Sequence, residues 1–357
     1  MERPIPAPLN SPVSDLDTPA LVVDNDQVMT NHKVFSAKIL DIGSVLIPDV
    51  SIHSSVGITL MQTGGDRNSQ IHCRTLACAE IFNKNGFSNI IIDQPAPNEE
   101  TLTRLKNLSR ITSLKIDISN SYGITEIVKT INKSGITVNV NLSIAQSIKS
   151  RGFIIGKELL TTISLINATK ELSLTGFTIE FGQDDPKSIS NFIELLKRFI
   201  ANNNLQFESG NHFDIHLDSV ADFTNITESN VNVVNGDYLF NYVNQSNGEN
   251  NSCWVLSTVM SHPESGRWYL DCGQKAISTD RGFPKIINEA PLEIETMSAE
   301  HGYVFSRTGE HPIKLGDRIK LIPANYADTF NLYDFINISS KDRLTNILRV
   351  DSRGALN

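Results

Sequence analysis

The stretch SVLIPDVSI at residues 44–52 is the first of eight short apolar runs that decide the fold. It is rich in valine and isoleucine, a composition typical of a strand that is buried on both faces. Similar runs follow at 70–75, 89–94, 114–119, 137–144, 176–182, 213–219 and 230–234. Buried strands of this kind occur in parallel sheets that helices cover, so the eight runs favour an α/β protein.

Amphipathic segments lie between these runs. The segment at 75–86 ends on a glycine that suits a helix C-terminus, and the segment at 98–109 opens with acids that suit an N-terminus. The segment at 188–204 carries apolar residues at helical spacing. Eight strand–helix units predict a (β/α)8 TIM barrel. A doubly wound open sheet is the alternative, but the sequence has no glycine fingerprint for a dinucleotide.

The pattern changes near residue 250, where short alternating segments replace the helical ones. We therefore predict three parts: an N-terminal segment with a leading strand at 1–24, a barrel at 25–250 and a C-terminal antiparallel β-domain at 251–357. The leading strand, PALVVD at 19–24, precedes the barrel. We expect it to pair with the C-terminal β-domain.

The bulk composition excludes several classes of protein. The chain has 357 residues and a formal net charge of −9, which argues against a nucleic-acid partner. No apolar run is long enough to span a bilayer, and the proline-rich N-terminus does not resemble a signal peptide. The four cysteines are scattered rather than spaced as a disulfide framework. These features predict a cytoplasmic protein with reduced thiols and no membrane partner.

Several motifs resemble those of a known family. They are DLDTPALVVDNDQVMTNHKVFSAKI at 15–39, NGDYLFNY at 235–242, STVMSHPESGRWYLDCGQKAISTDRGFP at 257–284 and LGDRIKLIPANYADTFNLYD at 315–334. In this order they are similar to the D-serine dehydratase and D-threonine aldolase family. The resemblance implies an alanine racemase-like barrel that binds pyridoxal phosphate, a C-terminal β-domain that carries zinc ligands, lyase activity and a homodimer.

The same resemblance shows three departures from the family pattern. The position of the family's imine-forming lysine holds Ser51, although His53 matches. The two zinc-ligand positions hold Asn325 and Ala327, and Asp328 follows one residue later. The family's glycine-rich phosphate turn corresponds to IHLDSVADF at 215–223, which carries Asp218 and Asp222. A hydroxyl cannot form an imine, and carboxylates repel a phosphate dianion.

The ends of the predicted strands carry the remaining candidate site residues, because barrel sites lie at the carboxyl ends of the strands. They are Ser51, His53, Arg74, Asp93, Ser143, Glu180, His216, Asp218 and Asp237. Glu180, His216 and Asp218 could form an acid/base or metal cluster. The alternative is that these polar residues cap loops and bond to the backbone.

A second group of residues takes its candidate roles from the resemblance. Tyr238 and Gly236 follow the family's cofactor-proximal run, although Tyr238 could instead pack the base of the site. Lys275 fits another family run, and its alternative role is a surface charge. Lys115 could form an imine if its side chain pointed into the barrel.

We therefore hypothesise a non-catalytic homologue without pyridoxal phosphate or zinc, which acts as a binding or assembly module with a small molecule at the barrel mouth. The alternative is an active pyridoxal-phosphate lyase on D-serine or a D-β-hydroxy amino acid, with another lysine in place of the lost one. A third hypothesis is a metal or hydrolytic activity at Glu180, His216 and Asp218. The sequence leaves open whether the protein is an enzyme.

Overall fold

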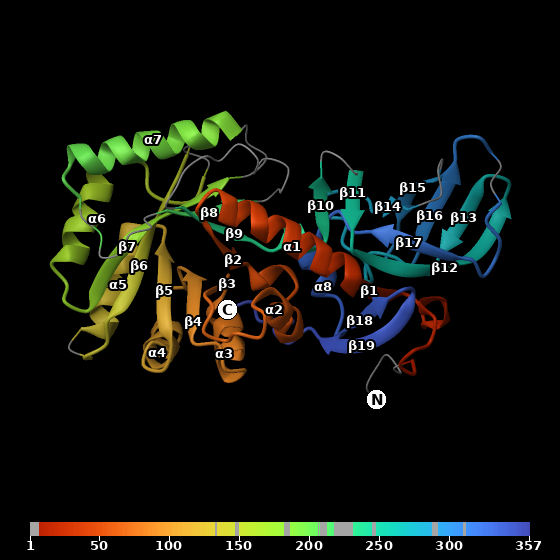
Figure 1. Cartoon of the computed structure of the whole chain (residues 1–357), viewed down its shortest axis with the longest axis horizontal. Coiled ribbons are helices and arrows are strands. Elements are labelled where there is room, and N and C mark those ends of the chain that lie inside the picture. The colour runs from red at the N-terminus through yellow and green to blue at the C-terminus, as the bar shows by residue number, and fades with distance from the viewer. Residues whose placement is uncertain are drawn as a thin grey trace. The chain divides into compact units, whose positions relative to one another are not determined.

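The structure is a computed structural model of the chain (Figure 1). It describes residues 7–357 apart from 133, 147–149, 182–185, 206, 208–212, 218–230, 245–247, 288–291 and 310–311. The chain divides into two compact units. One contains Lys33–Ser51, Thr59–Tyr238 and Ala355–Asn357, and the other contains Met1–His32, Ile52–Ile58 and Leu239–Gly354.

The first unit is a barrel of eight parallel strands, as the sequence predicts. The strands are β2 (Val45–Pro48), β3 (Ile71–Cys73), β4 (Asn89–Asp93), β5 (Ser113–Ile118), β6 (Val138–Ile144), β7 (Leu172–Phe181), β8 (Phe213–Leu217) and β9 (Val231–Asn235). Each overlaps one predicted run, and they pair in the order β2-β9-β8-β7-β6-β5-β4-β3. The barrel is nearly closed, since an isolated bridge between Asp49 and His72 joins its two end strands.

Helices alternate with the barrel strands along the chain. They are α1 (Asn25–Asp41), α2 (Val56–Gln62), α3 (Leu76–Lys84), α4 (Glu99–Leu108), α5 (Ser121–Ile131), α6 (Lys157–Asn167) and α7 (Pro186–Asn202). Figure 1 shows α3 to α7 on the outside of the barrel strands. Side chains of Thr75, Asn98 and Asn120 cap α3, α4 and α5 by accepting a backbone N–H. Such caps stabilise a helix start that would otherwise leave donors unpaired.

The second unit is dominated by a mostly antiparallel sheet. Its strands are β1 (Ala20–Asp24), β12 (Cys253–Glu264), β13 (Arg267–Leu270), β14 (Lys285–Ile286), β15 (Leu292–Met297), β16 (Gly302–Ser306), β17 (Arg318–Ile322), β18 (Phe335–Ser340) and β19 (Arg343–Arg349). The leading strand β1 lies between β12 and β18. A separate hairpin pairs β10 (Asn241–Asn244) with β11 (Gly248–Asn251), and α8 (Tyr326–Phe330) is short. This sheet agrees with the predicted β-domain.

None of the helices in the described part of the chain has both the length and the hydropathy that a membrane-spanning helix requires. The longest of them, α1 and α7, have 17 residues each.

Candidate functional site

The interior of the barrel holds two layers of polar side chains. Alternate residues of a strand point to the same face, so Lys115 and Asp117 on β5 face the interior together, as do Asp214 and His216 on β8. We call the layer farther from the carboxyl ends of the strands the lower layer; it consists of Lys115, Asn141, Asp214 and Asn232. The upper layer is closer to those ends and consists of Asp49, His72, Asp93, Asp117 and His216.

The lower layer is a closed hydrogen-bond network around the carboxylate of Asp214. Lys115 Nζ lies 3.2 Å from Asp214 Oδ2, and Asn141 Nδ2 donates to the same oxygen at 2.7 Å. Asn232 Nδ2 donates to the other oxygen at 2.6 Å. Both carboxylate oxygens therefore have partners, which is what a buried charge needs in order to be tolerated.

His72 lies between two carboxylates in the upper layer. Its Nδ1 is 3.4 Å from Asp49 Oδ1, and its Nε2 is 3.1 Å from Asp93 Oδ1. Burial by itself lowers the pKa of His72, but the two carboxylates outweigh it and raise this pKa to about 10. Near neutral pH, His72 is therefore a buried imidazolium.

Two arginines complete the pairing of Asp49 and Asp93. Arg74 donates from Nε and Nη2 to Asp49 Oδ2, each at 3.3 Å, and Arg151 donates from Nη1 to Asp93 Oδ2 at 3.0 Å. Burial would raise the pKa of both carboxyls, but these arginines and His72 hold them well below their usual range. Asp49 and Asp93 therefore stay ionised and paired.

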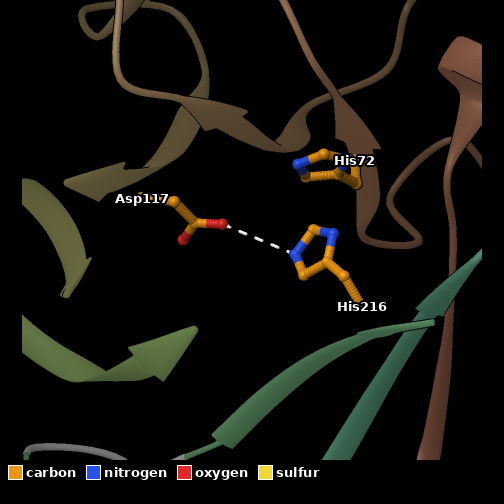
Figure 2. Close-up of side chains that lie close together, drawn as sticks. All are labelled: His72, Asp117 and His216. Atoms are coloured by element: carbon orange, nitrogen blue, oxygen red, sulfur yellow. Dashed lines mark ion pairs between the residues drawn. The ribbon is translucent and has the colours of Figure 1, made fainter. Parts of the chain in front are cut away.

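Asp117 and His216 differ from their neighbours, because they are buried without hydrogen bonds. Neither carboxylate oxygen of Asp117 nor either ring nitrogen of His216 has a hydrogen-bond partner within the described residues. His216 Nε2 lies 3.6 Å from Asp117 Oδ2, beyond hydrogen-bonding distance. Figure 2 shows the Asp117 carboxylate directed at the His216 ring, with the His72 ring beside it. The two rings are edge to face, 4.5 Å apart.

These three side chains have the composition of a metal-ligand set. One ligand atom each from His72, Asp117 and His216 lies within 4.8 Å of the other two. Two imidazoles and one carboxylate suit divalent transition metals. The arrangement could therefore hold a cation, or, without one, leave buried polar groups unsatisfied.

Ser51, which the resemblance aligns with the family's imine-forming lysine, makes two hydrogen bonds that fix its loop. Ser51 lies in the short helix η2 (Val50–Ile52) at the end of β2. Its hydroxyl accepts a hydrogen bond from the Arg74 backbone N–H at 2.9 Å, and its own N–H donates to Asp49 Oδ1 at 3.1 Å. Ser51 thus fixes the loop beside the upper layer and brings no amine to it.

Two other residues that the resemblance assigns to the site are packed in cores. His53 is fully buried in the compact unit that contains the sheet, where Nδ1 accepts from Ser55 N at 3.1 Å. Tyr238 is fully buried in the barrel unit and stacks on Phe35, with ring centroids 4.6 Å apart. Its hydroxyl accepts from Gln62 at 3.1 Å. These contacts agree with the alternative that Tyr238 packs the base of the site; Gly236 and Asp237 precede it in the loop after β9.

The predicted cluster of Glu180, His216 and Asp218 needs correction. Glu180 is partly exposed and pairs with Arg151 at 2.8 Å, while the neighbours of His216 are Asp117 and His72. Asp218 lies outside the described residues, as does Asp222 and thus most of the stretch that replaces the phosphate turn. Glu180 and His216 therefore have different neighbours, and a role of Asp218 beside either of them stays a prediction.

The sequence reasoning also missed two members of the upper layer. His72 and Asp117 both lie within predicted strands, before the strand ends at which we expect site residues. The available signal was a polar residue inside an otherwise apolar run, as in QIHCRT and LKIDIS. Ser143, a predicted candidate on β6, is buried, and its hydroxyl has no partner within the described residues.

The two alternative lysines lie in different surroundings. Lys115 does point into the barrel, but its amine pairs with Asp214 in the lower layer. Lys275 belongs to the other unit, is largely exposed and pairs with Glu300 at 2.5 Å. Lys115 is thus the only one of the two that the structure places inside the barrel.

The segment that corresponds to the family's zinc site has a structural role. Asn325 is the N-cap of α8: its Oδ1 accepts from Asp328 N at 3.1 Å, and its Nδ2 donates to Asp328 Oδ2 at 2.8 Å. Ala327 is within the helix and offers only a methyl group. Capping uses both ends of the Asn325 carboxamide, so these residues do not fit a zinc ion.

Comparisons with known proteins agree with this architecture. Residues 252–339 match the family described as "Putative serine dehydratase domain". The chain is 23% identical to a D-threonine aldolase of Arthrobacter sp, over 98% of this chain and 96% of the relative. It is 20% identical to a 3-hydroxy-D-aspartate aldolase of Paracoccus denitrificans (strain Pd 1222), over 98% and 95%.

A solved structure shares the fold over the whole length. The D-threonine aldolase from Filomicrobium marinum superposes with a TM-score of 0.85 at 20% identity, over 99% of this chain and 100% of that protein. The likeness confirms the barrel with its additional sheet. The sequence matches, which run over almost the whole chain, support its resemblance to the D-serine dehydratase and D-threonine aldolase family.

Proposed function

We propose that this protein does not carry out imine chemistry on pyridoxal phosphate and instead binds a small molecule at the barrel mouth. The observation that carries the proposal is Ser51, whose hydroxyl stands where the resemblance requires an amine. That hydroxyl is engaged by the Arg74 backbone N–H, and the loop is tied to Asp49. An aldehyde cofactor would find no nucleophilic nitrogen at this strand end.

The charges of the upper layer and of the side chains paired with it argue in the same direction. Asp49, Asp93, Asp117 and Glu180 bring four carboxylates, and Arg74, Arg151 and the imidazolium of His72 bring three positive charges. The excess is one negative charge. A phosphate dianion would be repelled by such a group unless a cation bridged them. These residues do not fit pyridoxal phosphate, and we derive no step through it.

The competing function is an active lyase in which Lys115 takes over the role of the lost lysine. Its side chain faces the barrel interior, which favours that reading. However, the amine shares Asp214 with two amide donors, one layer below His216. To attack an aldehyde it would have to leave this network and lose a proton, so that Asp214 would be left as a buried carboxylate without its cation.

A cavity supports the binding role. It has a volume of about 490 Å³, lies at the carboxyl ends of β3 and β4, and is lined among others by Arg74, Asp93, Glu100, Arg104 and Arg151. This volume is within the range of small-molecule sites. Three guanidiniums and two carboxylates on its walls suit a polar molecule that carries both charges, as an amino acid does.

The first part of the proposal, that the protein does not carry out imine chemistry, is tested by an activity assay. Purified chain is incubated with pyridoxal phosphate, Zn²⁺ and either D-serine or D-threonine, and pyruvate or glycine is measured. We expect no product above the cofactor-only background. Product from wild-type protein that disappears in Lys115→Met would overturn the proposal and establish the competing lyase.

The test of the binding half is thermal unfolding in the presence of D-serine, D-threonine or D-aspartate, with the L-enantiomers alongside. We expect at least one of them to raise Tm in the wild type and to raise it less in Arg151→Gln, because Arg151 lines the cavity. Lys129→Gln, which alters an exposed helix pair, is the matched control and should respond like the wild type. No shift with any of these zwitterions would contradict this half.

A further inference from the structure

We propose that His72, Asp117 and His216 form a binding site for one divalent transition-metal ion inside the barrel. The inference rests on the three side chains themselves, not on the proposed ligand function. They come from β3, β5 and β8, and their ligand atoms lie within 4.8 Å of one another. Figure 2 shows the three groups converging on one space.

The independent observation is that two of the three residues have unused polar atoms. Asp117 is fully buried and His216 is 4% exposed, and neither has a hydrogen bond within the described residues. The nearby guanidinium of Arg151 is committed to Asp93 and Glu180. In the described part of the chain, Asp117 keeps only the ion-pair contact with His216 at 3.6 Å. Burying a carboxylate without a hydrogen bond costs several kcal/mol, so such a group is normally hydrogen-bonded or bound to a metal.

The spacing requires only a small contraction. Ligands at about 2.0–2.2 Å from a tetrahedral ion are roughly 3.3–3.6 Å apart. The distance between His216 Nε2 and Asp117 Oδ2, 3.6 Å, is already at this limit. His72 would release one ring proton to solvent and turn that nitrogen from its carboxylate toward the ion, which changes its protonation and side-chain position but not the strand register.

The surroundings of His72 supply the support that metal-bound histidines usually have. Asp49 Oδ1 lies 3.4 Å from its Nδ1, and Asp49 is itself held by Arg74 and by the Ser51 N–H. A carboxylate that accepts from one ring nitrogen orients the other for a metal. Asp93, 3.1 Å from Nε2, lies where it could add a further oxygen ligand.

The donor set indicates the class of ion. Two imidazoles disfavour Mg²⁺ and Ca²⁺, which take oxygen ligands. The absence of thiolates from the trio disfavours soft ions. Zn²⁺, Co²⁺ and Fe²⁺ fit two histidines and one carboxylate, and three protein ligands leave a position open for water or a ligand. This centre is separate from the residues Asn325 and Ala327, which occupy the family's zinc-ligand positions.

The test uses the untagged full chain after chelator treatment and gel filtration. Zn²⁺ is titrated by calorimetry, and Co²⁺ is titrated in parallel because its visible bands report nitrogen and oxygen coordination. We expect one ion per chain. Asp117→Asn and His216→Gln should each lower the affinity at least tenfold, while His301→Gln, a histidine in the other compact unit, should bind as the wild type does.

Circular dichroism establishes that each variant is folded before binding is measured. Two independent ligand variants are used so that misfolding of one does not decide the outcome. No stoichiometric binding of Zn²⁺ or Co²⁺ by the wild type would overturn the inference. Binding that is equally strong in both ligand variants would overturn it as well, because it would place the ion elsewhere.

Discussion

The lower and upper layers of the barrel are made from similar residues and yet are satisfied to different degrees. In the lower layer, Lys115, Asn141 and Asn232 all donate to the Asp214 carboxylate. In the upper layer, Asp117 and His216 are just as deeply buried and have no hydrogen bond within the described residues. The lower layer is thus a complete hydrogen-bond network, whereas the upper layer contains two side chains without a hydrogen bond to any described residue.

The upper layer also contains a completed half. The imidazolium of His72 lies between the carboxylates of Asp49 and Asp93. Arg74 pairs with Asp49, and Arg151 pairs with Asp93. Among the described residues of the barrel strands, the buried polar side chains without any hydrogen bond are Asp117, His216 and Ser143, and His72 Nδ1 also lacks one. Asp117 and His216 face each other, which favours a ligand between them over poor packing throughout the barrel.

The largest effect is expected from breaking the lower layer. Asp214→Leu leaves the Lys115 amine and two amide donors in the barrel without their acceptor. Removing one partner of a buried ion pair costs about 3–5 kcal/mol, so the free energy of unfolding should fall by that amount. Denaturant unfolding measures it. Glu126→Gln, which removes an exposed pair with Lys129, is the control and should cost less than about 1 kcal/mol.

If Asp214→Leu lowers the free energy of unfolding no more than the control does, the lower layer contributes little to stability. That result would contradict the difference drawn here between the two layers.

A smaller loss is expected from the completed half of the upper layer. His72→Leu removes the imidazolium from Asp49 and Asp93, but both carboxylates keep an arginine. Hydrogen bonds to charged groups contribute about 1.5–3 kcal/mol, so we expect a destabilisation of about 2 kcal/mol in metal-free protein. Urea unfolding of wild type and variant gives the difference. If His72→Leu destabilises the protein more than Asp214→Leu does, the upper layer contributes more to stability than the lower layer, contrary to our expectation.

The smallest effect is expected at the unsatisfied carboxylate. Asp117→Asn removes a buried charge that has no hydrogen bond, but it leaves an unpaired amide in the same place. The two effects oppose each other, so metal-free stability should change by no more than about 1 kcal/mol, toward stabilisation. In the presence of zinc, the wild type gains stability by mass action and the variant should not. Thermal unfolding with and without Zn²⁺ tests both statements. A loss of several kcal/mol in metal-free protein would mean that Asp117 already has a partner.

The sequence predicts the fold more completely than the site, for a physical reason. Each barrel strand is a local run of apolar residues, so all eight runs were recognisable from composition. Even there the limits shift: β7 begins at Leu172, before the predicted start at 176, and its pairing with β6 is irregular between Leu174 and Gly176.

The composition of the upper layer, by contrast, depends on which residues of β3, β5 and β8 lie at the same height along the barrel axis. Alternation within a strand gives the face on which His72 or Asp117 lies, but the stagger between strands determines which of them meet. The sequence therefore offered Glu180 as a neighbour of His216, and the structure places Glu180 with Arg151. Ser51, by contrast, could be identified from the sequence, because the type of residue at a position does not depend on the three-dimensional structure.

Our central proposal is that the lysines of the described part of the barrel do not hold an aldehyde cofactor, and borohydride trapping tests it most directly. The full chain is incubated with pyridoxal phosphate, reduced, digested and analysed by mass spectrometry, with Lys115→Met alongside. We predict no yellow protein after gel filtration and no stoichiometric pyridoxyl adduct at any lysine. One adduct per chain at Lys115, absent from the variant, would contradict the account.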